Sequence, residues 1–374
     1  MELFLGVDEM MKEAIRILHV VTYMGRGGLE TMIMNYYRHM DRSKIQFDFL
    51  VHRDFEADYD KEILSMGGKI YHISRLVPWS RKYYKKLKKF FQKHPEYKIV
   101  HVHQDCLSSV ALRCAKECDV PIRIAHSHTK NQDMNLKYWI KRYYMKQIPY
   151  FATECFACSK EAGDWMFKGH QYHILRNAID ASIYNYSYEK AIKLRKEFHL
   201  ENNFVIGHVG RFETMKNHTF LIDIFYECIR FDPNARLLLV GEGKERTRIQ
   251  KKVKDLGLEG RVIFTGVRCD VADLLQMMDV FVFPSLYEGL GIAAIEAQAA
   301  GVPCILSSKV PTECKLTKNV KFLSLKDSPE IWMKQIFAYK NIPHIDTYES
   351  ICKAGYDIKE NAERLQTFYC NGVY

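Results

Sequence analysis

The stretch PSLYEGLGIAAIEAQAAGVP, residues 284–303, indicates how this chain folds. It follows an apolar, strand-like run that ends at Phe283, and it places Gly289 and Gly291 directly before a helix of small residues that ends at Gly301. Glycines in that position leave the first backbone N–H groups of the helix uncovered, and the helix dipole adds about half a positive charge there. The stretch therefore predicts a strand, a loop and a helix whose N-terminus can hold a phosphate group.

Two glutamates belong to this loop and helix. Glu288 lies at the mouth of the phosphate cradle, and Glu296 lies about two turns into the helix. Alanines such as Ala293 and Ala297 surround Glu296, so its carboxylate needs hydroxyl or N–H partners. A lone Gly-x-Gly would indicate only a generic turn with a surface glutamate, whereas the added spacing E-x7-E is more specific.

Short apolar runs alternate with longer helical stretches through the rest of the chain. The pattern starts near Ile15, reaches YHILRN (172–177), and begins again with a helix at 190–200 and the strand NFVIGHVGR (203–211). Such alternation implies parallel sheets made of βαβ units. We therefore expect an α/β protein with two doubly wound, Rossmann-like domains joined near 178–188, whose ligand-binding loops face one central cleft.

The composition excludes several classes of protein. With 374 residues, 47% of them apolar, the chain suits a soluble protein of two domains, and it has no apolar run of transmembrane length. The acidic start MELFLGVDEM lacks the basic region of a secretory signal. The eleven cysteines are scattered, so we expect reduced thiols, and Cys155 and Cys158 have no second ligand pair for zinc.

The net charge of +10 favours anionic partners, namely nucleotides, acidic lipids or nucleic acid. Much of this charge falls in RKYYKKLKKFFQKHPEYK (81–98), where eight basic residues accompany one acid. Apolar side chains recur there every three or four residues, which predicts an amphipathic helix. One interpretation is a surface helix with its lysines in water, and the other is docking on an anionic membrane face.

The E-x7-E block resembles that of the family-four retaining glycosyltransferases, which have the two-domain GT-B fold, and the resemblance covers almost the whole chain. The other segments that match the family's pattern are MGRGGLE (24–30), HILRNAID (173–180), VGRFETMKNH (209–218), LLVGEG (238–243) and IFTG (263–266). The C-terminal YDIKENAERLQTFY is similar to that of bacterial capsule and exopolysaccharide enzymes in the family. One departure is Ala178, where the family's interdomain segment usually has glycine.

The resemblance implies a donor-binding set. Arg211 and Lys216 would hold the donor diphosphate, where two cations stabilise the charge that grows as the pyrophosphate leaves. Glu288 would accept hydrogen bonds from the sugar's hydroxyls, and Glu296 from both ribose hydroxyls; Glu288, Arg211 and Lys216 are also catalytic candidates. The other donor-binding residues implied are Gly27 and Gly28 from the first domain, Val267 and Arg268 near the base, Ser285, and the backbone of Gly289, Leu290, Gly291 and Ile292.

Two His-x-His pairs end strands of the first domain, His101 with His103 and His126 with His128. Period-two spacing puts both members of a pair on one face of a strand. Four histidines can suggest a metal site, but no carboxylate or cysteine obviously converges on them, and the family uses no metal. The resemblance places one catalytic histidine near the sugar's reactive carbon; His128 fits best, with His126 as the alternative register. We expect His101 and His103 to be strand-end or cleft-lining residues.

Asp58 and Asp60 match the Asp-x-Asp of metal-dependent, single-domain glycosyltransferases, where it binds a cation that bridges the diphosphate. In this chain the two acids stand at the start of a predicted helix, where negative charge suits the helix dipole. We therefore expect no metal and no other cofactor.

The resemblance also implies an organisation of the chain. Residues 1–14 would be an N-terminal extension, 15–177 an acceptor-side domain, 178–345 a nucleotide-sugar-binding domain, and 346–374 a helical segment that can cross back to the first domain. The implied activity is retaining transfer of a hexosyl group from a nucleotide sugar, with a UDP-sugar as the expected donor. The implied acceptor is a glycan or a lipid-linked glycan in cell-surface polysaccharide synthesis.

We expect a cytoplasmic protein that helix 81–98 could hold peripherally on the inner face of the cell membrane. Two alternatives stay open. One is a sugar-nucleotide epimerase on the same fold, which would lack the pairing of Glu288 with Glu296. The other is a basic nucleic-acid-binding protein, for which only 81–98 has the required basic and aromatic pattern; no nucleic-acid partner is expected.

Overall fold

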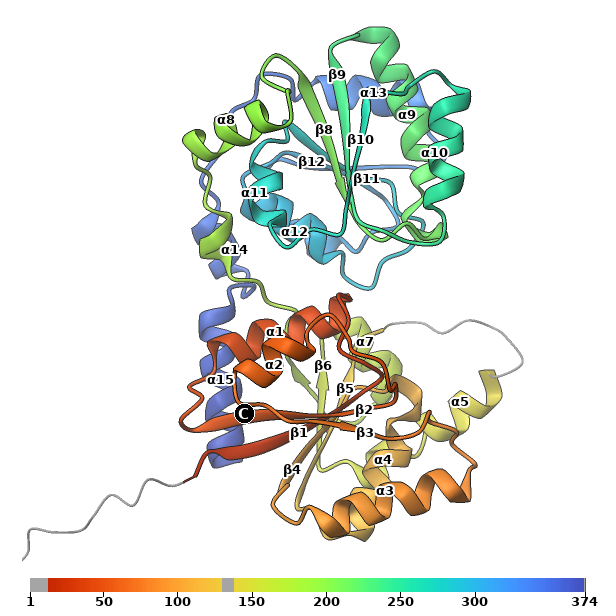
Figure 1. Ribbon diagram of the computed structural model, residues 1–374, viewed down its shortest axis with the longest axis vertical. Coiled ribbons are helices and arrows are strands. Elements are labelled where there is room, and N and C mark those ends of the chain that lie inside the picture. Colours follow the sequence, from red (N-terminus) through yellow and green to blue (C-terminus); the bar gives the residue numbers. More distant parts are fainter. Residues whose placement is uncertain (1–12, 130–137, 373) are drawn as a thin grey trace, which may run out of the picture. The chain divides into compact units, whose positions relative to one another are not determined.

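The computed structural model describes residues 13–129, 138–372 and 374, and the chain forms two compact units (Figure 1). The first unit contains the chain up to Ala178 together with Ile358–Tyr374, and the second contains Ile179–Asp357. Most of the expected extension over 1–14 lies outside the described residues. Among the residues that are described, no helix is both long and apolar enough to span a membrane.

The first unit is built on a parallel sheet that has seven strands in the described residues, in the order β3-β2-β1-β4-β5-β6-β7. The strands are β1 (Ile15–Val21), β2 (Ile45–Val51), β3 (Ile70–His72), β4 (Ile99–Val102), β5 (Ile122–Ser127), β6 (Glu154–Ala157) and β7 (His173–Ile174). The helices are α1 (Gly28–His39), α2 (Asp60–Ser65), α3 (Arg81–Lys93), α4 (Ser108–Glu117), α5 (Tyr138–Met145), α6 (Ile148–Phe151), α7 (Lys160–Phe167) and α15 (Ile358–Asn371).

Helices cover both faces of this sheet, which is why its strands are apolar almost throughout. In β1, Ile17 and Val21 pack into a core with side chains of α1 and α15, while Leu18 and Val20 pack into a second core with side chains of α3 and α4. Successive side chains of a strand point to opposite faces, so each strand contributes to both cores.

The predicted basic helix forms as α3. The Ser80 hydroxyl caps it by accepting a hydrogen bond from the backbone N–H of Tyr83 at 3.2 Å. Tyr83, Leu87 and Phe91 follow one another at intervals of four and form its buried stripe. The lysines between them consequently lie toward solvent.

Helix α15 follows the second unit in the sequence but belongs to the first unit. It packs against α1, and Leu365, Phe368 and Tyr369 are buried in the core that both helices share. The return begins at Ile358 and not at Asp346, because residues 346–357 stay with the second unit.

The second unit is built on a six-stranded parallel sheet, counted over its described residues, in the order β10-β9-β8-β11-β12-β13. The strands are β8 (Phe204–Val209), β9 (Ala235–Val240), β10 (Val262–Gly266), β11 (Val280–Phe283), β12 (Cys304–Ser307) and β13 (Val320–Leu323). The helices are α8 (Tyr188–Glu197), α9 (His218–Phe231), α10 (Arg246–Asp255), α11 (Val271–Gln276), α12 (Ile292–Ala299), α13 (Pro329–Phe337) and α14 (Tyr348–Lys353).

The prediction of two parallel α/β sheets is confirmed, with small differences. β7 contains only His173–Ile174 of the predicted 172–177, and β13 was not predicted. β13 is an edge strand in which the exposed Lys321 interrupts the apolar run, so its sequence signal is weak.

In both sheets the chain builds outward from a central strand and then returns to that strand's other side. β8 lies between β9 and β11, and β1 lies between β2 and β4. At such a switch point the loops diverge, and ligands bind outside the carboxyl ends of the strands. Functional side chains are therefore expected after β8 and β11 in the second unit, and after β1 and β4 in the first.

Candidate functional site

Helix α12 begins with the glycine cap that the sequence predicted. The N-cap residue is Gly291, whose φ of +88° lies in the left-handed region that glycine tolerates best. A glycine has no side chain to occupy the first N–H groups of the helix, and the first turn contains no acid. This end of α12 can therefore bind an anion through its backbone and its dipole.

The loop before α12 contains a buried serine with an unused hydroxyl. Ser285 follows β11, is fully buried, and its backbone oxygen accepts a hydrogen bond from the Ser307 hydroxyl at 2.5 Å. The Ser285 hydroxyl has no hydrogen-bond partner among the described residues. Buried polar groups are normally paired, so this hydroxyl is available to a ligand.

Lys216 and Glu288 form an ion pair that joins the loops after β8 and β11. Lys216 Nζ donates a hydrogen bond to Glu288 Oε1 at 2.7 Å and lies 4.7 Å from the centre of the Phe283 ring. Glu288 is 8% exposed, and charges interact more strongly away from water. A phosphate bound beside the ammonium group would share its positive charge with Glu288.

The carboxylate of Glu296 has the hydroxyl partner that its apolar surroundings on α12 require. Its Oε1 accepts a hydrogen bond from the Tyr184 hydroxyl at 3.0 Å. Burial raises the pKa of Glu296, while the bond from Tyr184 and the charge of Lys216 act to lower it. Sequence reasoning missed Tyr184, which lies 112 positions away in the chain, because no local pattern connects the two residues.

Arg211 lies on the loop after β8, but its side chain does not contact the ion pair of Lys216 and Glu288. Arg211 is exposed, and its guanidinium lies 3.4 Å from Glu213 on the same loop. Close packing of this loop explains a glycine in LLVGEG: a Cβ on Gly241 would lie 2.2 Å from the backbone oxygen of Gly210. The two loops can therefore approach only with glycine at position 241.

The residues expected near the base lie at the carboxyl end of β10. Val267 is 56% exposed, and Gly266 before it adopts a φ of +73°. The Arg268 guanidinium donates to Asp270 Oδ1 at 2.7 Å, which holds it on its own loop. Leu290 is buried, and its backbone oxygen contacts the Cys314 thiol.

In the first unit, Gly27 and Gly28 form the start of α1, after β1. Gly27 is its N-cap, and a Cβ there would lie 2.3 Å from Glu30 Oε2, so Glu30 folds back over the helix start. The two acids of the Asp-x-Asp are used locally: Asp58 Oδ2 accepts from the Arg26 backbone N–H at 3.1 Å, and Asp60 Oδ2 from that of Ala57 at 2.9 Å. Asp60 is also the first residue of α2, as predicted for this motif.

The four predicted histidines lie together, and a fifth joins them. His101 lies in β4 and His103 just after it, and His126 lies in β5 and His128 just after it. His19 lies beside them in β1. His19 is aligned directly with His101 in the register of the sheet. It was missed because ILHVV contains a single histidine within an apolar strand, and only the strand pairing brings it to the others.

All five imidazoles are held in the neutral form. Burial lowers the pKa of His19 and of His128 to about 3. Burial, and then the neighbouring imidazoles, hold the pKa of His101, His103 and His126 well below the usual range.

In groups of three, the ring nitrogens of the five histidines are close enough together to bind one metal cation. Two trios, His19 with His101 and His103, and His103 with His126 and His128, bring one nitrogen of each ring within 4.8 Å of one another. No carboxylate or thiolate belongs to either trio. The expected absence of a metal in the reaction therefore stays a prediction that a chelator can test.

Asp105 is a third residue that sequence reasoning missed, after Tyr184 and His19. It follows β4 with a φ of +44°, and its Oδ1 has no partner among the described residues. Burial raises its pKa to about 6, although a hydrogen bond from the backbone of His128 acts to lower it.

Comparison with known proteins gives matches along most of the chain. The family model described as Glycosyl transferases group 1 matches residues 189–340, and the model described as Glycosyltransferase Family 4 matches residues 26–183. The putative glycosyltransferase EpsF of Bacillus subtilis is 31% identical over 369 residues, which cover 95% of this chain and 96% of EpsF. The capsular polysaccharide biosynthesis glycosyltransferase CapH of Staphylococcus aureus is 24% identical over 373 residues, 95% of this chain and 98% of CapH.

Solved structures match the fold. Anabaena HepE in complex with UDP-glucose aligns with a TM-score of 0.73 at 20% sequence identity, over 94% of each chain. The alignment extends through both units described above.

Proposed function

Since the chain belongs to the GT-B glycosyltransferases of group 1 and family 4, we propose that it transfers a hexosyl group, with retention at the anomeric carbon, from a UDP-sugar to a glycan or lipid-linked acceptor. Membership makes it a glycosyltransferase; the donor, the stereochemistry and the acceptor are what we propose. EpsF and CapH both carry the name glycosyltransferase, and neither favours the epimerase alternative.

The observation that carries this proposal is the group of side chains around the start of α12. The ammonium of Lys216, the carboxylate of Glu288, the free hydroxyl of Ser285 and the glycine cap at Gly291 all lie at the carboxyl ends of β8 and β11. This edge of the sheet offers positive charge and N–H donors for a diphosphate, with a carboxylate beside them for sugar hydroxyls. Glu296 follows on the same helix for the ribose.

The proposed reaction needs no carboxylate nucleophile. The acceptor oxygen forms a bond to the anomeric carbon from the face that the diphosphate leaves, and the departing phosphate oxygen takes the acceptor's proton. Lys216, Arg211 and the N-terminus of α12 stabilise the charge that grows on the diphosphate. Glu288 orients the sugar, and the resemblance assigns His128 a place beside the reactive carbon, with His126 as the less exposed alternative.

Two relatives support the finer assignments. HepE is described in complex with UDP-glucose, which supports a uridine donor, and CapH is named for capsular polysaccharide biosynthesis, which supports a cell-surface polysaccharide as product. The acceptor is then a growing glycan, carried by a lipid at the inner face of the cell membrane.

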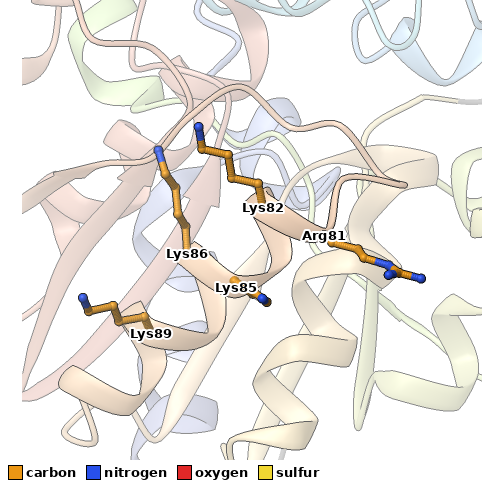
Figure 2. A pocket seen from close by; sticks show the side chains of 5 residues that line it. All are labelled: Arg81, Lys82, Lys85, Lys86 and Lys89. Atoms are coloured by element: carbon orange, nitrogen blue, oxygen red, sulfur yellow. The ribbon is translucent and has the colours of Figure 1, made fainter.

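The basic face of α3 supports this membrane assignment. Figure 2 shows Arg81, Lys82, Lys85, Lys86 and Lys89 projecting from the helix, and all five are exposed. Tyr144 of α5 donates to the backbone oxygen of Pro78 at 3.0 Å, so α5 lies beside the segment that leads into α3. Three aromatic side chains of these segments are more than half exposed, Trp79, Trp139 and Tyr143, and so is Tyr150 of the following helix α6. Lysines beside exposed aromatics suit the interface of an anionic bilayer.

The first test is a panel of nucleotide sugars, scored by thermal stabilisation of the purified protein. The stabilising donor is then incubated with lipid-linked glycan extracted from a polysaccharide-producing bacterium, and the anomeric configuration of the product is determined by NMR. We expect a UDP-sugar to stabilise and an α-donor to give an α-product. Conversion of the donor sugar without any acceptor would indicate an epimerase instead, and a β-product would exclude retention.

A further inference from the structure

The five clustered histidines, His19, His101, His103, His126 and His128, form two hydrogen-bonded chains that cross neighbouring strands. In one chain, His103 lies between His19 and His128, with facing ring nitrogens 3.0 Å and 2.9 Å apart. In the other, His101 lies between the Tyr369 hydroxyl at 2.7 Å and His126 at 3.2 Å. Each chain ends on one of the two histidines that the sequence offered as neighbours of the sugar.

The two ends differ in how far they are buried. His126 is fully buried, whereas His128 lies just beyond β5 and its side chain is partly exposed. His103 contacts Nε2 of His128, and Nδ1 of His128 has no partner among the described residues. His128 therefore has one nitrogen fixed by the protein and a second nitrogen, Nδ1, that is buried and unpaired among the described residues.

In the chain of His19, His103 and His128, the tautomer of each ring depends on the tautomer of its neighbour. A neutral imidazole has one N–H, so it donates through one nitrogen and accepts through the other. Both nitrogens of His103 are engaged. If His103 donates to His128, the proton of His128 is on Nδ1; if it donates to His19, His128 donates in return and its Nδ1 is bare.

Burial removes the third possibility, a protonated ring that donates from both nitrogens. A charged imidazole in this apolar core would lose its hydration without a carboxylate partner. The chain is therefore neutral near pH 7, and the state of His128 Nδ1 depends on the two rings behind it.

We propose that His103, supported by His19, is a positioning residue that fixes both the ring orientation and the tautomer of His128. The proposal rests on the proposed function, in which His128 contacts the donor sugar. In the opposite tautomer, Nδ1 of His128 would reverse its role as donor or acceptor toward the sugar. A tilted ring would move Nδ1 away from the sugar. His103 thus acts through His128 and touches no substrate itself.

The kinetic test is a double-mutant cycle on kcat. His103→Phe keeps the ring volume but removes both hydrogen bonds, and we expect kcat to fall between about tenfold and a hundredfold. The KM for the donor should change little, because the nucleotide is bound in the second unit. His103→Phe combined with His128→Phe should be no slower than His128→Phe alone, since one residue acts through the other.

The matched control is His101→Phe. His101 lies two residues before His103, is also buried and also contacts two partners, but its chain ends on His126. We expect its kcat to stay near that of the wild type. If His103→Phe does not fold, His19→Phe removes the far partner of the same chain and should give a smaller loss of kcat.

A second measurement does not depend on activity. Nitrogen-15 NMR of the imidazoles reports which ring nitrogen carries the proton, and we expect His128 to be a single tautomer in the wild type and a mixture in His103→Phe. An unchanged tautomer of His128 would overturn the positioning role. Full activity of His128→Phe, together with a changed His128 tautomer in His103→Phe, would instead refute the proposed contact of His128 with the sugar.

Three further outcomes would overturn the proposal. Additive losses in the double variant would mean that His103 acts independently of His128. An equal loss in His101→Phe would indicate a general effect on the sheet. A stoichiometric metal ion in the wild type that is absent from His103→Phe would make these rings ligands and not hydrogen-bonding partners.

Discussion

At the scale of single residues, Glu296 is the proposed partner of the donor's ribose. Its carboxylate lies on an alanine-rich helix and accepts the Tyr184 hydroxyl at 3.0 Å. Replacing Glu296 with Ala removes the proposed acceptors of the ribose hydroxyls, so UDP affinity should fall by about 1–3 kcal/mol. Isothermal titration calorimetry with UDP measures this change directly.

The control for this variant is Tyr184→Phe, which keeps the carboxylate and removes only its hydroxyl partner. We expect it to bind UDP more tightly than Glu296→Ala does. Equal UDP affinity in the wild type and in Glu296→Ala would contradict the ribose role.

Lys216 leads to a prediction about metal ions. Its ammonium, with Arg211 and the start of α12, is proposed to supply the positive charge that a divalent cation supplies elsewhere. Transfer should therefore persist in excess EDTA. If EDTA abolishes transfer and manganese restores it, Asp58 and Asp60 or the histidine trios become the candidate ligands. That result would refute the proposal that Lys216, Arg211 and the start of α12 supply the charge without a metal ion.

At the scale of elements, the ends of β1, β4 and β5 should make the first unit sensitive to acid. The folded-state pKa values of their histidines lie below the ordinary value of 6.5, with His19 and His128 at about 3. As the pH falls below about 6.5 the unfolded chain takes up protons that the folded chain does not. The free energy of unfolding should then decrease by up to about 1.4 kcal/mol per pH unit for each such histidine.

Urea unfolding between pH 7.5 and 5.5 measures this slope. Trp332 is the tryptophan of the second unit, so in a Trp332→Phe background the other three, Trp79, Trp139 and Trp165, report on the first unit. His19→Phe should reduce the slope, whereas His170→Phe, at an exposed position, should not. An equal slope in wild type and His19→Phe would contradict the assigned pKa of His19.

The exposed face of α3 gives a second prediction for an element. Each Lys or Arg near an anionic surface contributes about 1 kcal/mol to membrane binding. The wild type should therefore sediment with anionic liposomes, and Lys82, Lys85, Lys86 and Lys89 replaced together by Ser should release it without changing UDP affinity.

The matched control replaces four exposed lysines of the second unit, Lys193, Lys196, Lys251 and Lys254, by Ser. Because both variants lose the same charge, a difference between them locates the contact on α3. Equal release by both, or equal binding of the wild type to neutral liposomes, would leave α3 as a solvated helix face.

At the scale of the whole molecule, α15 ties the two ends of the described chain to one core. Tyr369 is 2% exposed among side chains of α1, β1 and β2, and its hydroxyl contacts His101. Tyr369→Ala should lower the free energy of unfolding of the first unit by about 3–5 kcal/mol, the usual cost of removing a buried aromatic ring. The neighbouring Cys370 is exposed, so Cys370→Ala should cost far less; similar losses in both would show that α15 is not part of the core.

The fold followed from the sequence because its signals are local. Strands and helices alternate within windows of a few residues, and the glycine cap at Gly291 and the glutamates Glu288 and Glu296 lie in one short stretch. The parts that sequence reasoning missed are pairings between distant segments. His19 meets His103 across 84 positions, and Tyr369 meets His101 across 268, so only the completed sheet brings them together.

The return of α15 also has a consequence for synthesis. The segment that completes the first unit follows Asp357, and therefore leaves the ribosome after the whole of the second unit. Until then the apolar side chains of α1 and β2 that α15 covers stay uncovered on the nascent chain. The second unit is continuous in sequence and can fold as it emerges from the ribosome. The first unit is translated first but is completed last, because α15 is its final helix. During that interval its uncovered apolar surface is a binding site for chaperones.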